Sequence, residues 1–97
     1  MGKYVFDYYG SENDGGNDAW MNWFKDLGSK IVDPGNMFAD NGMAVEKSGV
    51  SKIENYPATG YTIVKADSME EAVEMAKGCP LMQFDSNAVR VYEAMPM

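Results

Sequence analysis

Residues 59–97, TGYTIVKADSMEEAVEMAKGCPLMQFDSNAVRVYEAMPM, decide the fold of this chain. The stretches 61–66 and 88–94 are rich in the β-branched and aromatic residues that favour strands. Between them, residues 69–77 follow the three-and-four spacing of an amphipathic helix. The stretch therefore predicts a strand, a helix, a short loop and a second strand.

Both ends of that helix carry clear signals. Ser68 and Glu71 have the S-x-x-E spacing of a capping box. Gly78 stands where the helix ends, and Pro80 prevents its continuation. The apolar residues in between form one stripe that packs on a sheet: Met69, Ala72, Val73 and Ala76.

The first third of the chain repeats this pattern. A strand is expected over residues 3–9, followed by a polar, glycine-rich connection over residues 10–18. The next helix is expected to be capped by Asn17 or Asp18 and stopped by Gly28. Its apolar stripe consists of Trp20, Trp23, Phe24 and Leu27.

A second strand is expected over residues 30–33, before Pro34-Gly35. The middle of the chain is less regular. Residues 43–47 and 49–53 are compatible with a hairpin that turns at Ser48-Gly49, and residues 55–57 with a loop.

Two strand-helix-strand halves make the ferredoxin-like β-α-β-β-α-β motif, an α+β fold in one domain over residues 1–97. Both helices should then cover one face of an antiparallel sheet. The strands at 61–66 and 88–94 are nevertheless apolar on both sides, so the other face also needs a cover. With two helices available, the simplest cover is a second copy of the chain, which predicts a homodimer in the form of a dimeric α+β barrel.

Composition restricts the classes of function. The net charge is −7, and the eight basic residues are scattered, so we expect no nucleic acid partner. Neither a signal peptide nor a membrane span is expected. Cys79 is the only cysteine and histidine is absent, so we expect no disulfide, no metal site and no cofactor. These features fit a reducing cytoplasm.

Two aspartates are candidate catalytic groups. Asp33 precedes Pro34-Gly35, where it is either a carboxylate base or, as local turn chemistry favours, a turn residue. Asp7 lies in the middle of a strand between aromatic residues. It is a site candidate if that strand face is buried and a solvated charge if the face is open.

Ligand-binding candidates come from the strands. Arg90 is the single arginine, and it either holds an anion or pairs with Asp7 or Glu93, the pairing being favoured. Tyrosines on strands are usually core or interface residues, but Tyr8 and Tyr9 lie near the flexible connection. We expect any site for a small organic ligand between the first strand and the helices, near Tyr8, Tyr9 and Asp33.

The chain resembles the YCII-related (YciI-like, DGPF-type) family. The resemblance is carried by A-D-S-x-E-E-A at 66–72, K-G-C-P at 77–80 and M-P-M at 95–97. It implies a ferredoxin-like homodimer similar to muconolactone isomerases. Some members of the YCII-related family are thought to be enzymes that use a His–Asp pair. Asp33 matches the aspartate, but the chain has no histidine, and residues 53–60 lack the Asp-Gly-Pro-Phe motif.

Two functions therefore stay open. The first is a dimeric module that binds a small ligand without catalysis. The second is a small isomerase or lyase in which a carboxylate and tyrosines replace the His–Asp pair. The absence of histidine favours the first.

Overall fold

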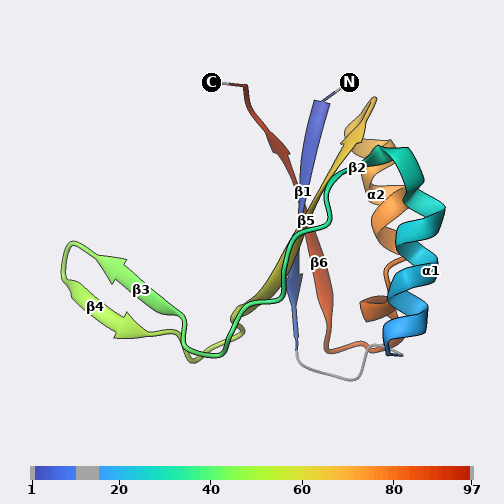
Figure 1. Cartoon of the computed structure of the whole chain (residues 1–97). Coiled ribbons are helices and arrows are strands. Elements are labelled where there is room, and N and C mark those ends of the chain that lie inside the picture. The colour runs from blue at the N-terminus through green and yellow to red at the C-terminus, as the bar shows by residue number, and fades with distance from the viewer. Residues whose placement is uncertain (1, 11–15, 97) are drawn as a thin grey trace.

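The computed structural model describes residues 2–10 and 16–96 (Figure 1). Its main elements follow the predicted order: β1 (Gly2–Tyr9), α1 (Asn17–Leu27), β2 (Ile31–Asp33), β5 (Ala58–Ala66), α2 (Met69–Lys77) and β6 (Ala88–Ala94). The strands form an antiparallel sheet in the order β2-β5-β1-β6, and both helices cover one of its faces (Figure 1). This is the ferredoxin-like α+β fold, as predicted.

A hairpin is inserted between β2 and β5. It consists of β3 (Met43–Glu46) and β4 (Gly49–Lys52), which pair only with each other. The predicted strands at 43–47 and 49–53 were each one residue too long. Figure 1 shows the hairpin projecting from the sheet on the side away from the helices. We call residues 43–52 the arm.

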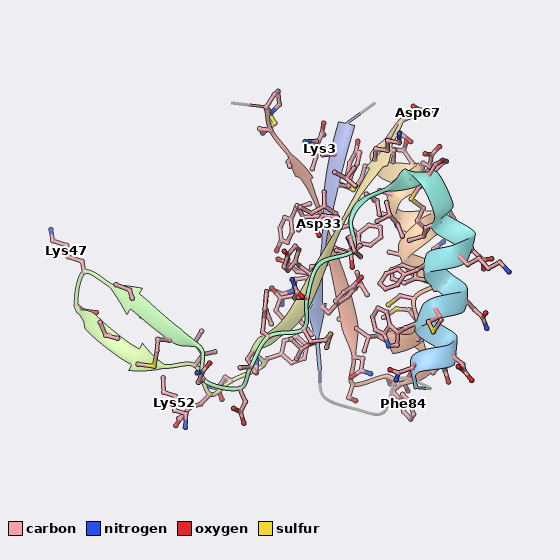
Figure 2. All side chains as sticks on the ribbon, in the orientation of Figure 1. Lys3, Asp33, Lys47, Lys52, Asp67 and Phe84 are labelled. Carbon is pink, nitrogen blue, oxygen red and sulfur yellow. The ribbon has the colours of Figure 1, made fainter. Side chains whose placement is uncertain are left out.

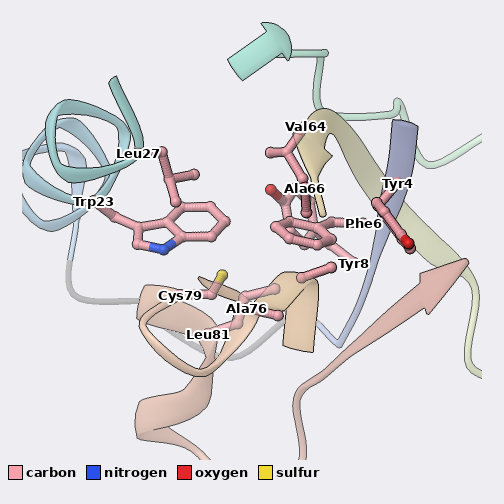
Figure 3. Close-up of a cluster of buried hydrophobic side chains, with 11 residues drawn as sticks. Tyr4, Phe6, Tyr8, Trp23, Leu27, Val64, Ala66, Ala76, Cys79 and Leu81 are labelled. Carbon is pink, nitrogen blue, oxygen red and sulfur yellow. The ribbon is translucent and has the colours of Figure 1, made fainter. Parts of the chain in front are cut away.

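The core lies between the sheet and the helices, as Figure 3 shows. Strict alternation along β1 buries Tyr4, Phe6 and Tyr8 on this side, and the Trp23 ring stacks on Phe6 with centroids 6.0 Å apart. The remaining apolar core residues come from both helices, β5 and the turn after α2: Leu27, Val64, Ala66, Ala72, Ala76, Cys79 and Leu81. Cys79 is thus a buried small apolar residue.

The ends of the helices follow the sequence signals with one exception. Ser68 Oγ accepts a hydrogen bond from the Glu71 N–H at 3.1 Å, so the predicted cap of α2 is confirmed. The N-cap of α1 is Gly16 and not Asn17 or Asp18, both of which lie inside the helix. Gly16 has φ +84°, a value that glycine adopts without strain. The predicted connection over residues 10–18 includes residues 11–15, which lie outside the described part of the chain.

Other details of the elements also differ from expectation. Residues 28–30 form a 3₁₀ turn, so the strand predicted from residue 30 begins at Ile31. β5 begins at Ala58, three residues before the predicted start, and Pro80–Gln83 form a second 3₁₀ turn. None of the described helices is long and apolar enough to cross a membrane.

The sheet face away from the helices, which we call the open face, is only partly covered by the loops that flank the arm, through Tyr56 on Tyr9 and Phe38 on Tyr61. It carries alternate residues of the strands: Val5, Asp7 and Tyr9 of β1, Tyr61 and Ile63 of β5, and Arg90 and Tyr92 of β6. These side chains are half-buried or exposed. The two-sided apolar character read from the sequence is therefore present in the folded chain.

Candidate ligand-binding site

A pocket of about 230 Å³ opens at one edge of the sheet, between α1 and the segment that follows β2. The residues that line it come from four parts of the chain: Tyr8, Asn17, Trp20, Phe24, Pro34, Gly35, Asn36, Met37, Tyr61 and Thr62. The pocket therefore depends on how residues 34–37 are placed against β5.

A tight turn places that segment. Asp33 Oδ1 accepts a hydrogen bond from the Gly35 N–H at 2.8 Å, which is the turn chemistry that the local sequence favours. Gly35 has φ +77°, and a Cβ at this position would overlap the carbonyl oxygen of Tyr61. The residue must therefore be glycine, for both backbone conformation and space.

Beyond the turn, the chain runs along the edge of β5. The Tyr61 N–H donates to the Asn36 carbonyl oxygen at 3.3 Å, and the Phe38 N–H donates to that of Thr59 at 2.9 Å. These bonds hold one wall of the pocket against the sheet, although β2 itself ends at Asp33. Figure 2 shows Asp33 at this point of the fold.

The floor of the pocket is a chain of two hydroxyl groups. The Tyr8 hydroxyl donates to Thr62 Oγ1 at 2.6 Å, and the Thr62 hydroxyl donates to the Pro34 carbonyl oxygen at 2.8 Å. Burial raises the pKa of the Tyr8 phenol well above its ordinary range, while the bond to Thr62 opposes the shift only in part. Tyr8 is therefore a neutral donor and acceptor near neutral pH, and not a base.

The side walls are aromatic. The Trp20 ring meets Tyr8 edge to face with centroids 5.2 Å apart, and it lies 5.8 Å from Phe24. On the β5 side of the pocket, the Phe38 ring stacks on the Tyr61 ring with centroids 5.9 Å apart. These distances are those of favourable aromatic pairs, so the walls support one another.

The structure divides the residues that the sequence placed in one site. Tyr8 lines the pocket, and Asp33 lies beside it, with Oδ2 3.5 Å from the Tyr61 hydroxyl. Tyr9 and Arg90 lie on the open face instead. The expectation that Tyr8 and Tyr9 share a cleft is wrong, because adjacent residues of a strand point to opposite faces.

Arg90 packs against two tyrosine rings on the open face. Its guanidinium carbon lies 4.4 Å from the centroid of the Tyr9 ring and 5.9 Å from that of Tyr56, and the two rings stack at 5.3 Å. Tyr56 has φ +46°, a strained value for a tyrosine.

The expected ion pair of Arg90 does not form. Asp7 is its direct cross-strand partner, but the ion pairs found among residues 2–10 and 16–96 join only Lys30 to Glu71 and Lys77 to Glu74. The guanidinium group is instead drawn to the negative faces of the rings. Asp7 is half-buried on the open face, away from the pocket.

Several pocket residues were missed from the sequence, and Trp20, Phe24 and Thr62 are the most informative of them. Trp20 and Phe24 were assigned to the apolar stripe of α1 alone, although both also line the pocket. Thr62 did carry a signal, since it is the polar member of the buried alternation that continues with Val64 and Ala66. A fully buried hydroxyl requires a partner, which here is Tyr8.

A solved structure has a similar fold. 5-Chloro-2-hydroxyhydroquinone dehydrochlorinase (TftG) from Burkholderia phenoliruptrix AC1100, solved in complex with 2,5-dihydroxybenzoquinone, superposes with a TM-score of 0.57. The alignment covers 94% of this chain and 93% of TftG at 16% sequence identity. No protein-family model and no curated protein sequence matches the chain. Because the similarity spans nearly the whole of both chains, it identifies the ferredoxin-like α+β fold.

Proposed function

We propose that this protein binds a small, neutral aromatic compound that carries a hydroxyl group, in the pocket beside α1. The observation that carries the proposal is the hydroxyl chain of Tyr8 and Thr62 at the floor of an aromatic-walled pocket. Small-molecule sites usually have this composition, mostly apolar walls with a few well-placed polar groups.

The hydrogen-bonding pattern selects a donor on the ligand. The Tyr8 proton is committed to Thr62, so the Tyr8 oxygen offers its lone pairs as acceptors. A phenolic hydroxyl of the ligand would donate to that oxygen while its ring contacts Trp20 and Phe24. At about 230 Å³ the pocket is smaller than the roughly 300–1,000 Å³ typical of drug-sized ligands, which favours a single ring.

Charge favours a neutral ligand. Among residues 2–10 and 16–96, no Asp, Glu, Lys or Arg side chain lines the pocket, and Tyr8 stays protonated because burial raises its pKa. An ionised ligand would lose its hydration without gaining an opposite charge, which is costly.

We further propose that the chain is a distant relative of the YCII-related family that keeps a ligand site without the family's His–Asp pair. The support is the family resemblance together with the fold shared with TftG, whose bound 2,5-dihydroxybenzoquinone is a single-ring compound with two hydroxyl groups. Histidine is absent from the sequence. Binding is therefore favoured over acid–base catalysis.

Calorimetric titration with hydroquinone tests the binding proposal. We expect one hydroquinone per chain, with at least tenfold weaker binding of 1,4-dimethoxybenzene, which lacks the hydroxyl donor. Tyr8→Phe should weaken hydroquinone binding to a similar extent, whereas Tyr9→Phe, on the other face of the sheet, should not change it. Equal affinity for both compounds, or no binding of hydroquinone, would refute the proposal.

A second candidate function is a small isomerase or lyase, and it depends on one contact. The Tyr61 hydroxyl faces Asp33 Oδ2 at 3.5 Å, a long hydrogen bond, and Tyr61 borders the pocket at the sheet edge although its side chain belongs to the open face. A shorter bond in a ligand complex would let the carboxylate take a proton through the phenol. Chloride release from 5-chloro-2-hydroxyhydroquinone that is lost in Tyr61→Phe would favour this function; equal release in both proteins would exclude it.

We also propose that the protein is a homodimer that packs through the open face. The half-buried Val5, Tyr61 and Ile63 lie on that face without a second layer from the same chain over most of it. Sedimentation equilibrium at micromolar concentration should give twice the 10.7 kDa chain mass. Ile63→Lys should weaken the dimer, and Val73→Lys, on the helical side, should not.

A further inference from the structure

We propose that the arm, residues 43–52, packs its apolar face on a second copy of this chain, so that two chains clasp each other. The inference rests on the homodimer proposed above and adds a second contact surface to the open face. It is independent of the ligand pocket.

The pairing of β3 with β4 makes the arm two-faced. Val45 is opposite Val50, and Met43 is opposite Lys52, so these four residues share one face, on which three side chains are apolar. The other face carries the second set of alternate residues, which are small or polar: Ala44, Glu46, Gly49 and Ser51. Alternation of this kind is typical of a sheet that buries one side.

Within one chain the apolar face of the arm is not buried. Met43 is 54% exposed, Val45 77% and Val50 64%. An isolated two-stranded hairpin is only marginally stable in water, and this one pairs with no other strand in the part of the chain that the structure describes. The arm therefore needs a surface from another molecule.

The solvent-accessible area of the chain indicates how much surface is available for contact with a second molecule. The chain exposes 6714 Å², whereas a compact monomer of 10.7 kDa would expose about 5,500 Å². The excess of about 1,200 Å² is more than the roughly 800 Å² that each partner buries in a standard interface. The radius of gyration, 14.3 Å, likewise exceeds the value of about 12.5 Å expected for 97 residues.

The direction of the arm favours a second copy as the partner. Figure 1 shows that it projects on the side of the sheet opposite the helices, which is the side of the open face. A chain seated on the open face would lie alongside the arm. In a two-fold dimer each arm would then contact the other chain, and both arms would be used equally.

The base of the arm adds apolar surface to the same contact. A hollow of about 640 Å³ lies where the arm joins the sheet, and its lining includes Met37, Phe38, Ile53 and Pro57. Phe38 is 49% exposed there. The arm and its base therefore form one continuous apolar area.

Charge is complementary between the arm and the rest of the chain. The arm contains two lysines and one glutamate, a net charge of +1, while the whole chain carries −7. The remaining residues thus carry −8. An arm that crosses to a second copy brings positive charge to an acidic surface, which favours this partner electrostatically.

Two substitutions at adjacent positions of β4 test the proposal. Val50→Asp and Ser51→Asp each add one negative charge to the same strand, but on opposite faces of the arm. Sedimentation equilibrium of the full chain should show at least a tenfold weaker dimer for Val50→Asp and less than a threefold change for Ser51→Asp. Equal effects of the two substitutions, or none for Val50→Asp, would overturn the proposal.

A photo-crosslinking amino acid at position 45 provides the second measurement and does not require a destabilising charge. Irradiation of the purified protein should give covalent dimers, with far fewer from the same reagent at position 51. The proposal would also be overturned if no covalent dimer formed with the reagent at either position.

The outcomes separate the arm from the other proposals. If Ile63→Lys dissociates the dimer and Val50→Asp does not, the open-face homodimer stands and the clasp is wrong. If the unsubstituted chain sediments as a monomer, both are wrong. Hydroquinone titration tests the pocket in either case.

Discussion

Tyr8 and Thr62 are 54 positions apart in the chain and are joined by a hydrogen bond of 2.6 Å in the buried layer of the sheet. β1 and β5 are neighbours in the sheet, and both residues lie on the face that the helices cover. The Thr62 hydroxyl extends this link to the Pro34 carbonyl oxygen, so one short chain of hydroxyl groups connects β1, β5 and the segment after β2. The link serves both the stability of the sheet edge and the floor of the pocket.

Tyr8→Phe should lower the free energy of unfolding by about 1 kcal/mol, because the buried Thr62 oxygen loses its donor while the ring of residue 8 is kept. Urea denaturation at neutral pH measures the change. Tyr9→Phe on the open face is the matched control and should stay within about 0.5 kcal/mol of the unsubstituted protein. A Tyr8→Phe protein with unchanged stability would show that the bond is not formed.

Gly35→Ala should be strongly destabilising, since the added Cβ overlaps the Tyr61 carbonyl oxygen at a residue with positive φ. Gly49→Ala isolates the effect of the backbone, because Gly49 also has positive φ but has no heavy atom within 4 Å of an added Cβ. We expect Gly35→Ala to cost at least about 1 kcal/mol more than Gly49→Ala. Thermal denaturation of both variants measures the difference, and equal costs would contradict the close approach.

Ser68→Ala should lower the free energy of unfolding by about 1 kcal/mol, because the Glu71 N–H loses its partner at the start of α2. Ser51→Ala is the control and should be close to neutral, because Ser51 is exposed on the polar face of the arm. The measurement is the midpoint of chemical denaturation under conditions that keep the oligomeric state constant. An unshifted midpoint for Ser68→Ala would mean that the cap contributes nothing.

Glu71 should make stability depend on pH in the acid range. The Lys30 ammonium donates to Glu71 Oε1 at 3.0 Å, and this bond, with smaller help from the Asp67 N–H, holds the pKa of the carboxyl below its ordinary value of 4.5, against a partial desolvation effect. Because the folded pKa is the lower one, the carboxylate stabilises the fold above pH 4.5, and this contribution disappears as pH falls through the folded pKa.

The measurement is the difference in stability between the unsubstituted protein and Glu71→Gln from pH 7 to pH 3. The difference should be largest at neutral pH and should close below pH 4.5. Glu74→Gln is the control, since its pair with Lys77 is exposed on both sides and should contribute little. A difference that is constant over this range would rule out the effect.

The ferredoxin-like order of elements could be predicted because each half of the chain carries local signals, such as the Ser68 cap and the apolar stripe of α2. Those signals depend only on neighbours within a few residues. The burial of alternate residues along β1 and β5 followed from the same kind of pattern.

The site could be predicted only in part. Tyr8 and the neighbourhood of Asp33 were expected, but the contributions of Gly35, Asn36 and Met37 depend on hydrogen bonds to β5 residues more than 20 positions away. No local pattern encodes that register. Arg90 was expected to pair with Asp7 or Glu93. The register does place Asp7 opposite Arg90, but the loop that brings Tyr56 over Tyr9 was not foreseeable from the sequence.

The position of β1 has a consequence for synthesis. Its two neighbours in the sheet, β5 and β6, both come from the last 40 residues of the chain. When the ribosome has made the first half, β1 has no strand to pair with, and the aromatic residues of β1 and α1 have no sheet to cover them. Contacts between such distant segments form late and slowly, so the nascent chain presents these side chains to chaperones until the final strand emerges.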